Sequence, residues 1–125
     1  MNISFTLVIL IFIGCTWQNK KSPILTLDKT SYDYGRIKQQ DTLSNTIVVR
    51  NTGNDTLKIF KISATCHCLT PTIDKYEIAP LDSALLRVSI VSKNYTKGLY
   101  SEKIILESNS HELLTILNFK VNFTD

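Results

Sequence analysis

The sequence has few glycines and lacks the glycine-rich patterns that bind nucleotides. It contains 4 glycines in 125 residues. Those beyond the N-terminal segment, Gly35, Gly53 and Gly98, are isolated at expected turns. A G-x-G-x-x-G or P-loop motif needs clustered glycines so that the backbone can approach the phosphates. The sequence therefore gives no support to nucleotide chemistry.

The motifs of common hydrolases are missing as well. Neither G-x-S-x-G nor H-E-x-x-H occurs, so there is no nucleophile elbow and no zinc-protease helix. The acidic residues are spread singly along the chain, which is typical of solvated surface charges. His111 lies in "SNSHEL", an expected surface turn. We expect a protein that is not an enzyme and that binds no cofactor.

The chain also lacks a run of positive charge. Its formal net charge is +3, and Lys20 and Lys21 are the only adjacent basic residues. A nucleic-acid-binding surface gathers lysines and arginines into a patch that contacts phosphates. We therefore expect no nucleic-acid partner.

No apolar run is long enough to span a membrane. The apolar segment at 3–14, "ISFTLVILIFIG", falls short of the roughly 20 residues that a transmembrane helix needs. Its length is typical of the hydrophobic region of a signal peptide. The segment therefore predicts export rather than a membrane span.

The sequence "FIGC" at 12–15 resembles the lipobox of bacterial lipoproteins, in which the cysteine thiol is joined to diacylglycerol and the chain is cut just before it. The resemblance implies a signal peptide over 1–14, lipidation of Cys15 and a polar tether over 15–23. We expect a membrane-anchored lipoprotein of the bacterial cell envelope that faces the periplasm or the cell surface. An ordinary cleaved signal peptide and a short uncleaved anchor are the alternatives.

From residue 24 to 125 the hydrophobic pattern has a period of two and turn signals recur about every ten residues, which predicts an all-β domain. Strands are expected over 24–27, 32–36, 43–51, 56–65, 84–91, 99–108 and 112–123, with 70–83 as a proline-containing connection. About seven antiparallel strands in this length fit an immunoglobulin-like β-sandwich. A small closed barrel is the alternative.

Three strands show which residues should face the core. Leu43, Ile47 and Val49 alternate with polar residues in 43–51. In the next strand the expected apolar row consists of Phe60, Ile62, Ala64 and Cys66, and in the last strand it consists of Leu113, Leu117, Phe119, Val121 and Phe123. Side chains two apart share one face of a strand, so each row predicts a buried face.

The motif "TCHCLTP" has four interpretations. A structural zinc site needs four ligands, which only Cys66, His67, Cys68 and the distant His111 could supply. Copper(I) requires fewer thiolates, and a disulfide between Cys66 and Cys68 requires a tight turn at His67, because the two Cβ atoms lie too far apart in an extended strand. Both cysteines could also be small apolar thiols that cap a core strand.

The segment "YDYGRIKQQDTLSNTIVVRNTGNDTLKIFKISATCHCLTP" resembles the bacterial domain of unknown function 1573. The matching positions are Tyr32, Tyr34 and Gly35, then Asn51 and Gly53, then Cys66 and Cys68, followed by Thr70. His67 departs from the glycine that is more usual in the family, and Leu69 separates the second cysteine from Thr70. The resemblance covers roughly residues 24–123 and implies an immunoglobulin-like sandwich, similar to PapD-like modules, on an exported bacterial protein.

The sequence therefore predicts a lipid-anchored sandwich that binds an envelope protein through an exposed sheet edge or through loops at one end. Its membrane contact would be the lipid at Cys15. The alternative is a copper(I)-handling or thiol-exchange protein that acts through Cys66 and Cys68, with His67 as a further metal ligand.

Overall fold

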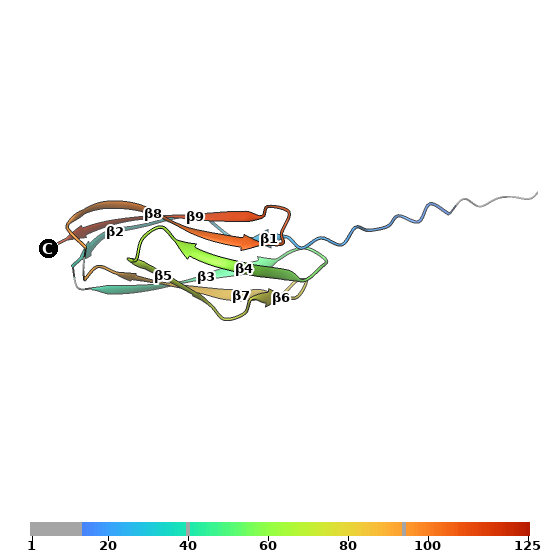
Figure 1. Cartoon of the computed structure of the whole chain (residues 1–125), viewed down its shortest axis with the longest axis horizontal. Helices are drawn as coiled ribbons and strands as arrows, with labels where there is room; N and C mark the ends of the chain where they lie inside the picture. The colour runs from blue at the N-terminus through green and yellow to red at the C-terminus, as the bar shows by residue number, and fades with distance from the viewer. Residues whose placement is uncertain (1–13, 40, 94) are drawn as a thin grey trace, which may run out of the picture.

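The chain forms two β-sheets that face each other, which confirms the predicted sandwich (Figure 1). The structure is a computed structural model, and it describes residues 14–39, 41–93 and 95–125. The predicted signal peptide over 1–14 lies almost wholly outside the described residues. No helix that could cross a membrane is found in the described part of the chain.

One sheet has four strands in the order β1-β3-β7-β5, and the other has five in the order β2-β9-β8-β4-β6. Their bounds are β1 Leu25–Thr26, β2 Ser31–Lys38, β3 Thr42–Asn51, β4 Leu57–Ala64, β5 Leu69–Ile73, β6 Glu77–Ile78, β7 Ser83–Val91, β8 Gly98–Ser108 and β9 Leu114–Thr124. Seven of these strands have five or more residues, and six of the seven correspond to predicted strands; the seventh, β5, begins at the end of the predicted turn motif and runs into the expected connection over 70–83. β1 and β6 have two residues each.

The sandwich is not purely antiparallel, because β2 runs parallel to β9. The chain first pairs β1 with β3 in one sheet. It then crosses to the other sheet, where it continues in the same direction and forms β2. The prediction of only antiparallel strands was wrong at this pair, since hydrophobic periodicity identifies strands but not their neighbours.

The core between the sheets follows the predicted alternation over most of its length. In β3 the inward residues Ile47 and Val49 are buried. β9 buries the alternate residues Leu117, Phe119, Val121 and Phe123. Leu113 was expected in this row but is exposed, because it precedes β9, which begins at Leu114 rather than at residue 112.

The predicted row in β4 is interrupted at Phe60, which is 65% exposed. The pairing of β4 with β8 shifts register between Ile59 and Lys61. Such a bulge adds one residue to a strand and reverses the facing of the side chains beyond it. The row that faces the core is therefore Leu57 and Ile59 before the bulge, then Ile62 and Ala64 after it.

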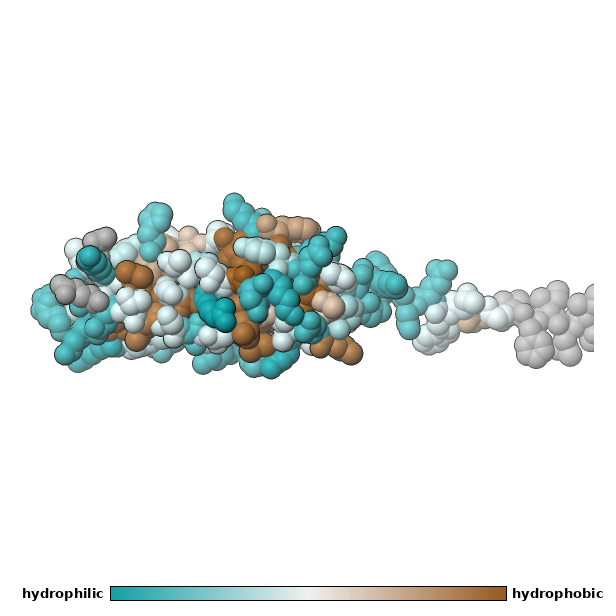
Figure 2. Space-filling view, turned by 90° about the horizontal axis from the view of Figure 1, so that it is seen from below, coloured by the Kyte–Doolittle hydropathy of each residue, from teal (hydrophilic) through white to brown (hydrophobic). Residues whose placement is uncertain are grey.

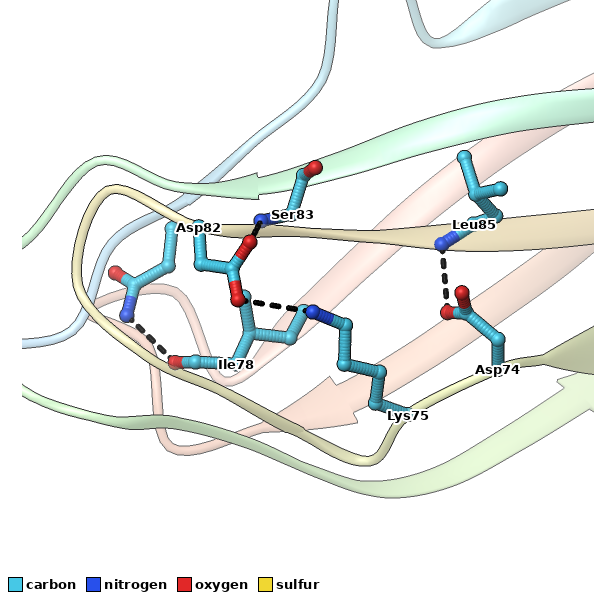
Figure 3. Close-up of polar contacts among 7 residues, drawn as sticks. Asp74, Lys75, Ile78, Asp82, Ser83 and Leu85 are labelled. Atoms are coloured by element: carbon cyan, nitrogen blue, oxygen red, sulfur yellow. Dashed lines mark hydrogen bonds and ion pairs between the residues drawn. The ribbon is translucent and has the colours of Figure 1, made fainter.

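The segment over 70–83 is not a simple connection, because β5 and β6 lie within it. Figure 3 shows how its polar side chains hold it: Asp74 accepts a hydrogen bond from the backbone N–H of Leu85 at 2.8 Å. Lys75 donates to Asp82 at 2.9 Å, and Asp82 also accepts from the backbone N–H of Ser83 at 2.8 Å. These bonds hold the segment that connects β5 to β7, which contains the two-residue strand β6 paired with β4 in the other sheet.

The N-terminal tether is bonded to one end of the sandwich by Asn51. This side chain is fully buried, and its Nδ2 donates to the carbonyls of Asp55 and Ile78 while its Oδ1 accepts from the N–H groups of Ile24 and Gly53. A Cβ at Gly53 would lie 2.2 Å from the carbonyl oxygen of Ser22. Only glycine therefore lets the tether pass this close to the turn.

Beyond this clamp, residues 14–21 form no strand and project from the sandwich along its long axis (Figure 1). The side chains along the tether are mostly hydrophilic, while apolar and polar side chains mix on the face of the sandwich seen in Figure 2. Cys15 is exposed and forms no disulfide.

Candidate functional site

The first candidate site is the turn between β4 and β5, where Cys66 and Cys68 form a disulfide. Their Cα atoms are 5.2 Å apart, within the usual range for a disulfide. The chain turns at His67, which is exposed, whereas Cys68 is fully buried and Cys66 packs against the core. The sulfur atoms thus lie at the edge of the core as a disulfide rather than as thiols.

This turn carries the chain from one sheet to the other. Ala64 ends β4 and Leu69 begins β5 in the facing sheet. The carbonyl of Cys68 accepts a hydrogen bond from the N–H of Val91 at 2.8 Å, which joins the turn to β7. The disulfide therefore closes a short corner between the two sheets.

The structure does not bring together the ligands of the zinc interpretation. His111 lies in the turn between β8 and β9, beside the start of β4, whereas Cys66 and Cys68 follow the end of β4. β4 has eight residues, so about 25 Å of strand separates the two places. In the described part of the chain no three His, Cys, Asp or Glu side chains form a group that could hold a metal.

The second candidate site is a groove between β2 and β3, one strand from each sheet. It has a volume of about 500 Å³, which lies within the usual range for ligand pockets. Its walls include Asp28, Lys29, Tyr32, Asp33 and Tyr34 on one side and residues 43–48 on the other. The groove lies where the chain crosses from β1 to β2. Because β1 pairs with only the last two residues of β3, most of β3 has no neighbouring strand on that side.

Inward-facing side chains line the groove without closing it. Leu43 belongs to the inward row of β3 that includes Ile47, yet it is 40% exposed. Tyr32 and Tyr34 stack with Phe119 of the core, with ring centroids 5.4 and 6.1 Å from it. The groove is therefore an open side of the hydrophobic core with two phenols at its wall.

The phenols give the groove its polar chemistry. The Nδ2 atom of Asn45 donates a hydrogen bond to Oη of Tyr34 at 2.7 Å. Burial raises the pKa of both Tyr32 and Tyr34, and the Asp28 carboxylate raises that of Tyr32 further. Both phenols are therefore neutral at pH 7, and Tyr34 can donate its hydroxyl proton to a ligand while it accepts from Asn45.

Sequence reasoning did not identify this groove, because its residues come from two strands in different sheets. In the sequence, Tyr32 and Tyr34 were singled out only as positions that match the family resemblance. The alternate aromatic pair beside Gly35 was a signal that both rings share one face. Which strand they face depends on the crossing from β1 to β2.

These features place the protein among the immunoglobulin-like β-sandwiches. More specifically, the chain belongs to the family described as Protein of unknown function (DUF1573), whose model matches residues 25–123. This match confirms the family resemblance of the sequence. No curated protein matches the chain.

Solved structures share the fold. A protein of unknown function from Porphyromonas gingivalis W83 is 22% identical, with a TM-score of 0.72, and the match covers 82% of this chain and 47% of that one. The chain thus spans about half the length of that protein. An ASH/PapD-like domain of human CEP192 is 10% identical, with a TM-score of 0.62 and coverage of 100% and 96%. At these identities the similarity shows the fold alone.

Proposed function

We propose that this protein is a lipid-anchored, non-enzymatic module of the bacterial cell envelope that binds another envelope protein. The groove between β2 and β3 carries this proposal, because it is an open side of the core with both apolar and hydrogen-bonding groups at its walls. Such a combination is typical of a recognition site. The exposed Cys15, on a tether whose last residues lead to the bond between the N–H of Ile24 and Asn51, supplies the place for the lipid.

The anchor is tested by labelling cells with a radioactive fatty acid. The wild-type chain is expected to take up label and the Cys15→Ser variant to take up none. Label in both chains, or in neither, would contradict lipidation at this residue.

The binding function is tested by in-cell crosslinking from photoreactive residues placed at two exposed positions in different sheets, Leu43 and Phe60. We expect at least one position to capture the same envelope protein reproducibly. Background recovery from both positions would argue against a binding module.

Thiol exchange at the Cys66–Cys68 disulfide is the second candidate function. The disulfide closes a loop of only three residues, so the chain-entropy model assigns it roughly 1.6 kcal/mol of stabilisation, less than a disulfide that closes a long loop. A thiolate from a partner would attack the sulfur of Cys66, which is partly exposed as a residue, and Cys68 would leave as a thiolate. Because Cys68 is buried, its departure as an anion is costly.

Reduction would also free the two thiolates that copper(I) binding requires. Titration of the disulfide against glutathione, and of the reduced protein with Cu(I), tests both activities. Reduction at envelope potentials or stoichiometric uptake of Cu(I), each lost in a Cys66→Ser, Cys68→Ser variant, would support this candidate. A disulfide that resists glutathione and a reduced protein that takes up no Cu(I) would argue against it.

A further inference from the structure

Long strands at the edges of a sheet invite pairing with other chains, and proteins block this with bulges, charges, proline or short strands. Among the described residues, four strands have an outer side that is wholly or largely unpaired: β2, β3, β4 and β5. The covering strands β1 and β6 pair with only two residues each. The four edges differ in whether they carry a blocking feature.

Three of the four edges carry such a feature. β2 shifts register between Asp33 and Arg36 and contains Gly35 with φ +62°. β4 shifts register just before Lys61, which is exposed. β5 has five residues and contains Pro71, whose nitrogen cannot donate a hydrogen bond.

The free part of the β3 edge, residues 42–49, has none of these features, and the charged Arg50 lies where β1 covers the strand. Its pairing with β7 continues without a shift from Thr42 to Arg50. Residues 42–49, "TLSNTIVV", contain no charge, proline or glycine. β3 is therefore the one long strand edge in the described part of the chain that is built to accept another strand.

The hydrogen-bond pattern shows which backbone groups this edge offers. The N–H of Asn51 bonds to the carbonyl of Asp82, on the β7 side, and the N–H of Thr52 bonds to the carbonyl of Ile24, on the outer side. In an antiparallel strand successive residues direct their N–H and C=O groups to opposite sides. Ser44, Thr46 and Val48 therefore direct both backbone groups outward.

The groove beside this edge fits the side chains of an added strand. Such a strand would place alternate side chains between the sheets, against Leu43 and Tyr34. The charged groups at the groove already have partners in the protein: Asp28 pairs with Arg50 at 2.7 Å, and the Lys29 ammonium lies 4.6 Å from the ring centroid of Tyr32. The Asp33 carboxylate accepts a hydrogen bond of 2.9 Å from the N–H of Gly35. The groove therefore favours an uncharged segment with apolar side chains at alternate positions.

We propose that an extended, uncharged segment of another protein adds to the free edge of β3 at residues 44–48 and inserts alternate apolar side chains into the groove between β2 and β3. This proposal rests on the proposed binding function and names its site and the chemistry of its partner. Backbone hydrogen bonds supply affinity in this mode of binding, and the alternate side chains supply specificity.

The test uses the full chain in detergent and a synthetic nine-residue peptide in which valine and threonine alternate, with one terminal lysine for solubility. Amide hydrogen exchange followed by NMR is expected to slow at least tenfold at Ser44, Thr46 and Val48 when the peptide is added, and to stay unchanged at the outer edge of β5. The same peptide with every second backbone nitrogen methylated keeps its side chains but loses donors on one side. It should bind at least tenfold more weakly.

A matched pair of variants separates the edge of β3 from general surface effects. Thr46 and Thr72 are both exposed and both lie opposite Arg87, one on each side of β7. Thr46→Lys places a charge on the β3 edge and is expected to weaken peptide binding at least tenfold, whereas Thr72→Lys should leave it unchanged. Equal effects of the two variants, or protection by the peptide at another edge, would overturn the proposal.

Two further outcomes are decisive. If the three amides are already protected in the free protein and the protein is a dimer, a second copy occupies the edge, and the proposed partner is wrong. If the peptide fails to protect them while crosslinking from Phe60 still captures an envelope protein, the strand site is wrong but the binding function stands. Failure of both experiments would overturn both proposals.

Discussion

Asn45 on β3 donates a hydrogen bond of 2.7 Å to the hydroxyl oxygen of Tyr34 on β2, so a side-chain hydrogen bond joins the two sheets across the open groove. The contact is partly buried, which makes it stronger than the same bond in water. It also sets the position of the phenol that faces a ligand in the groove.

Tyr34→Phe is expected to lower the free energy of unfolding by about 1 kcal/mol, because the amide of Asn45 loses its acceptor. Tyr32→Phe is the matched control, since no hydrogen bond to its hydroxyl is found among the described residues. The control should be nearly neutral. Urea unfolding of the two variants measures the difference, and equal losses would show that the bond across the groove contributes nothing.

Asn51→Ala is expected to destabilise the fold by about 3 kcal/mol, because it leaves the buried carbonyl of Ile78, the partly buried carbonyl of Asp55 and two N–H groups without their partner. Asn54→Ala removes an exposed side chain whose Oδ1 accepts from the N–H of Ser22. That control should cost less than about 1 kcal/mol. Thermal and urea unfolding provide the comparison, and a small effect at Asn51 would contradict its role as the clamp of the tether.

The environment of Asp82 leads us to expect that the free energy of unfolding falls in acid. The hydrogen bond from Lys75, the N–H of Ser83 and the Lys75 charge lower the pKa of this carboxyl below the reference value of 3.8. A lowered pKa in the folded state means that ionised Asp82 stabilises the fold above pH 3.8, and that this contribution is lost as the pH falls through the folded-state pKa.

The Asp82→Asn variant should therefore be less stable than wild type at pH 7. This difference in the free energy of unfolding, which we call the gap, should vanish at a pH below the folded-state pKa of Asp82. Urea unfolding of both proteins at the two pH values measures the gap. A gap of the same size in acid would show that the ion pair is not its cause.

Reduction of the Cys66–Cys68 disulfide is expected to lower stability by only about 1.6 kcal/mol, as the three-residue loop implies. Unfolding with and without a phosphine reductant measures the cost, and a Cys66→Ser, Cys68→Ser variant should not respond to the reductant. Loss of the fold on reduction would mean that the disulfide maintains the whole corner between β4 and β5.

The alternation of apolar residues was enough to predict the class of fold and much of the core. Val49 and Phe119 face inward as expected, because a strand of unbroken register keeps its period of two. Phe60 does not, because a bulge depends on the pairing of β4 with β8 rather than on β4 alone. The disulfide was one of several open interpretations, since it depends on the turn at His67.

The groove could not be predicted for a related reason. Tyr34 and Asn45 lie in strands whose local patterns say nothing about one another, and they meet because the chain changes sheets after β1. The same crossing makes β2 parallel to β9. The order of strands that are far apart in the sequence thus explains why the predicted topology was wrong at β2 and why the groove was not predicted.

The clamp around Asn51 also has a mechanical consequence. The tether continues along the long axis of the sandwich (Figure 1). Where it joins the domain, the N–H groups of Ser22, Ile24 and Leu25 bond to Asn54, Asn51 and Ser110, which lie in two different turns. A pull on the N-terminus runs parallel to the strands, while the hydrogen bonds between strands lie across them. These bonds are therefore loaded together in shear, so the domain is expected to resist tension along its tether better than a pull that opens the sheet one bond at a time.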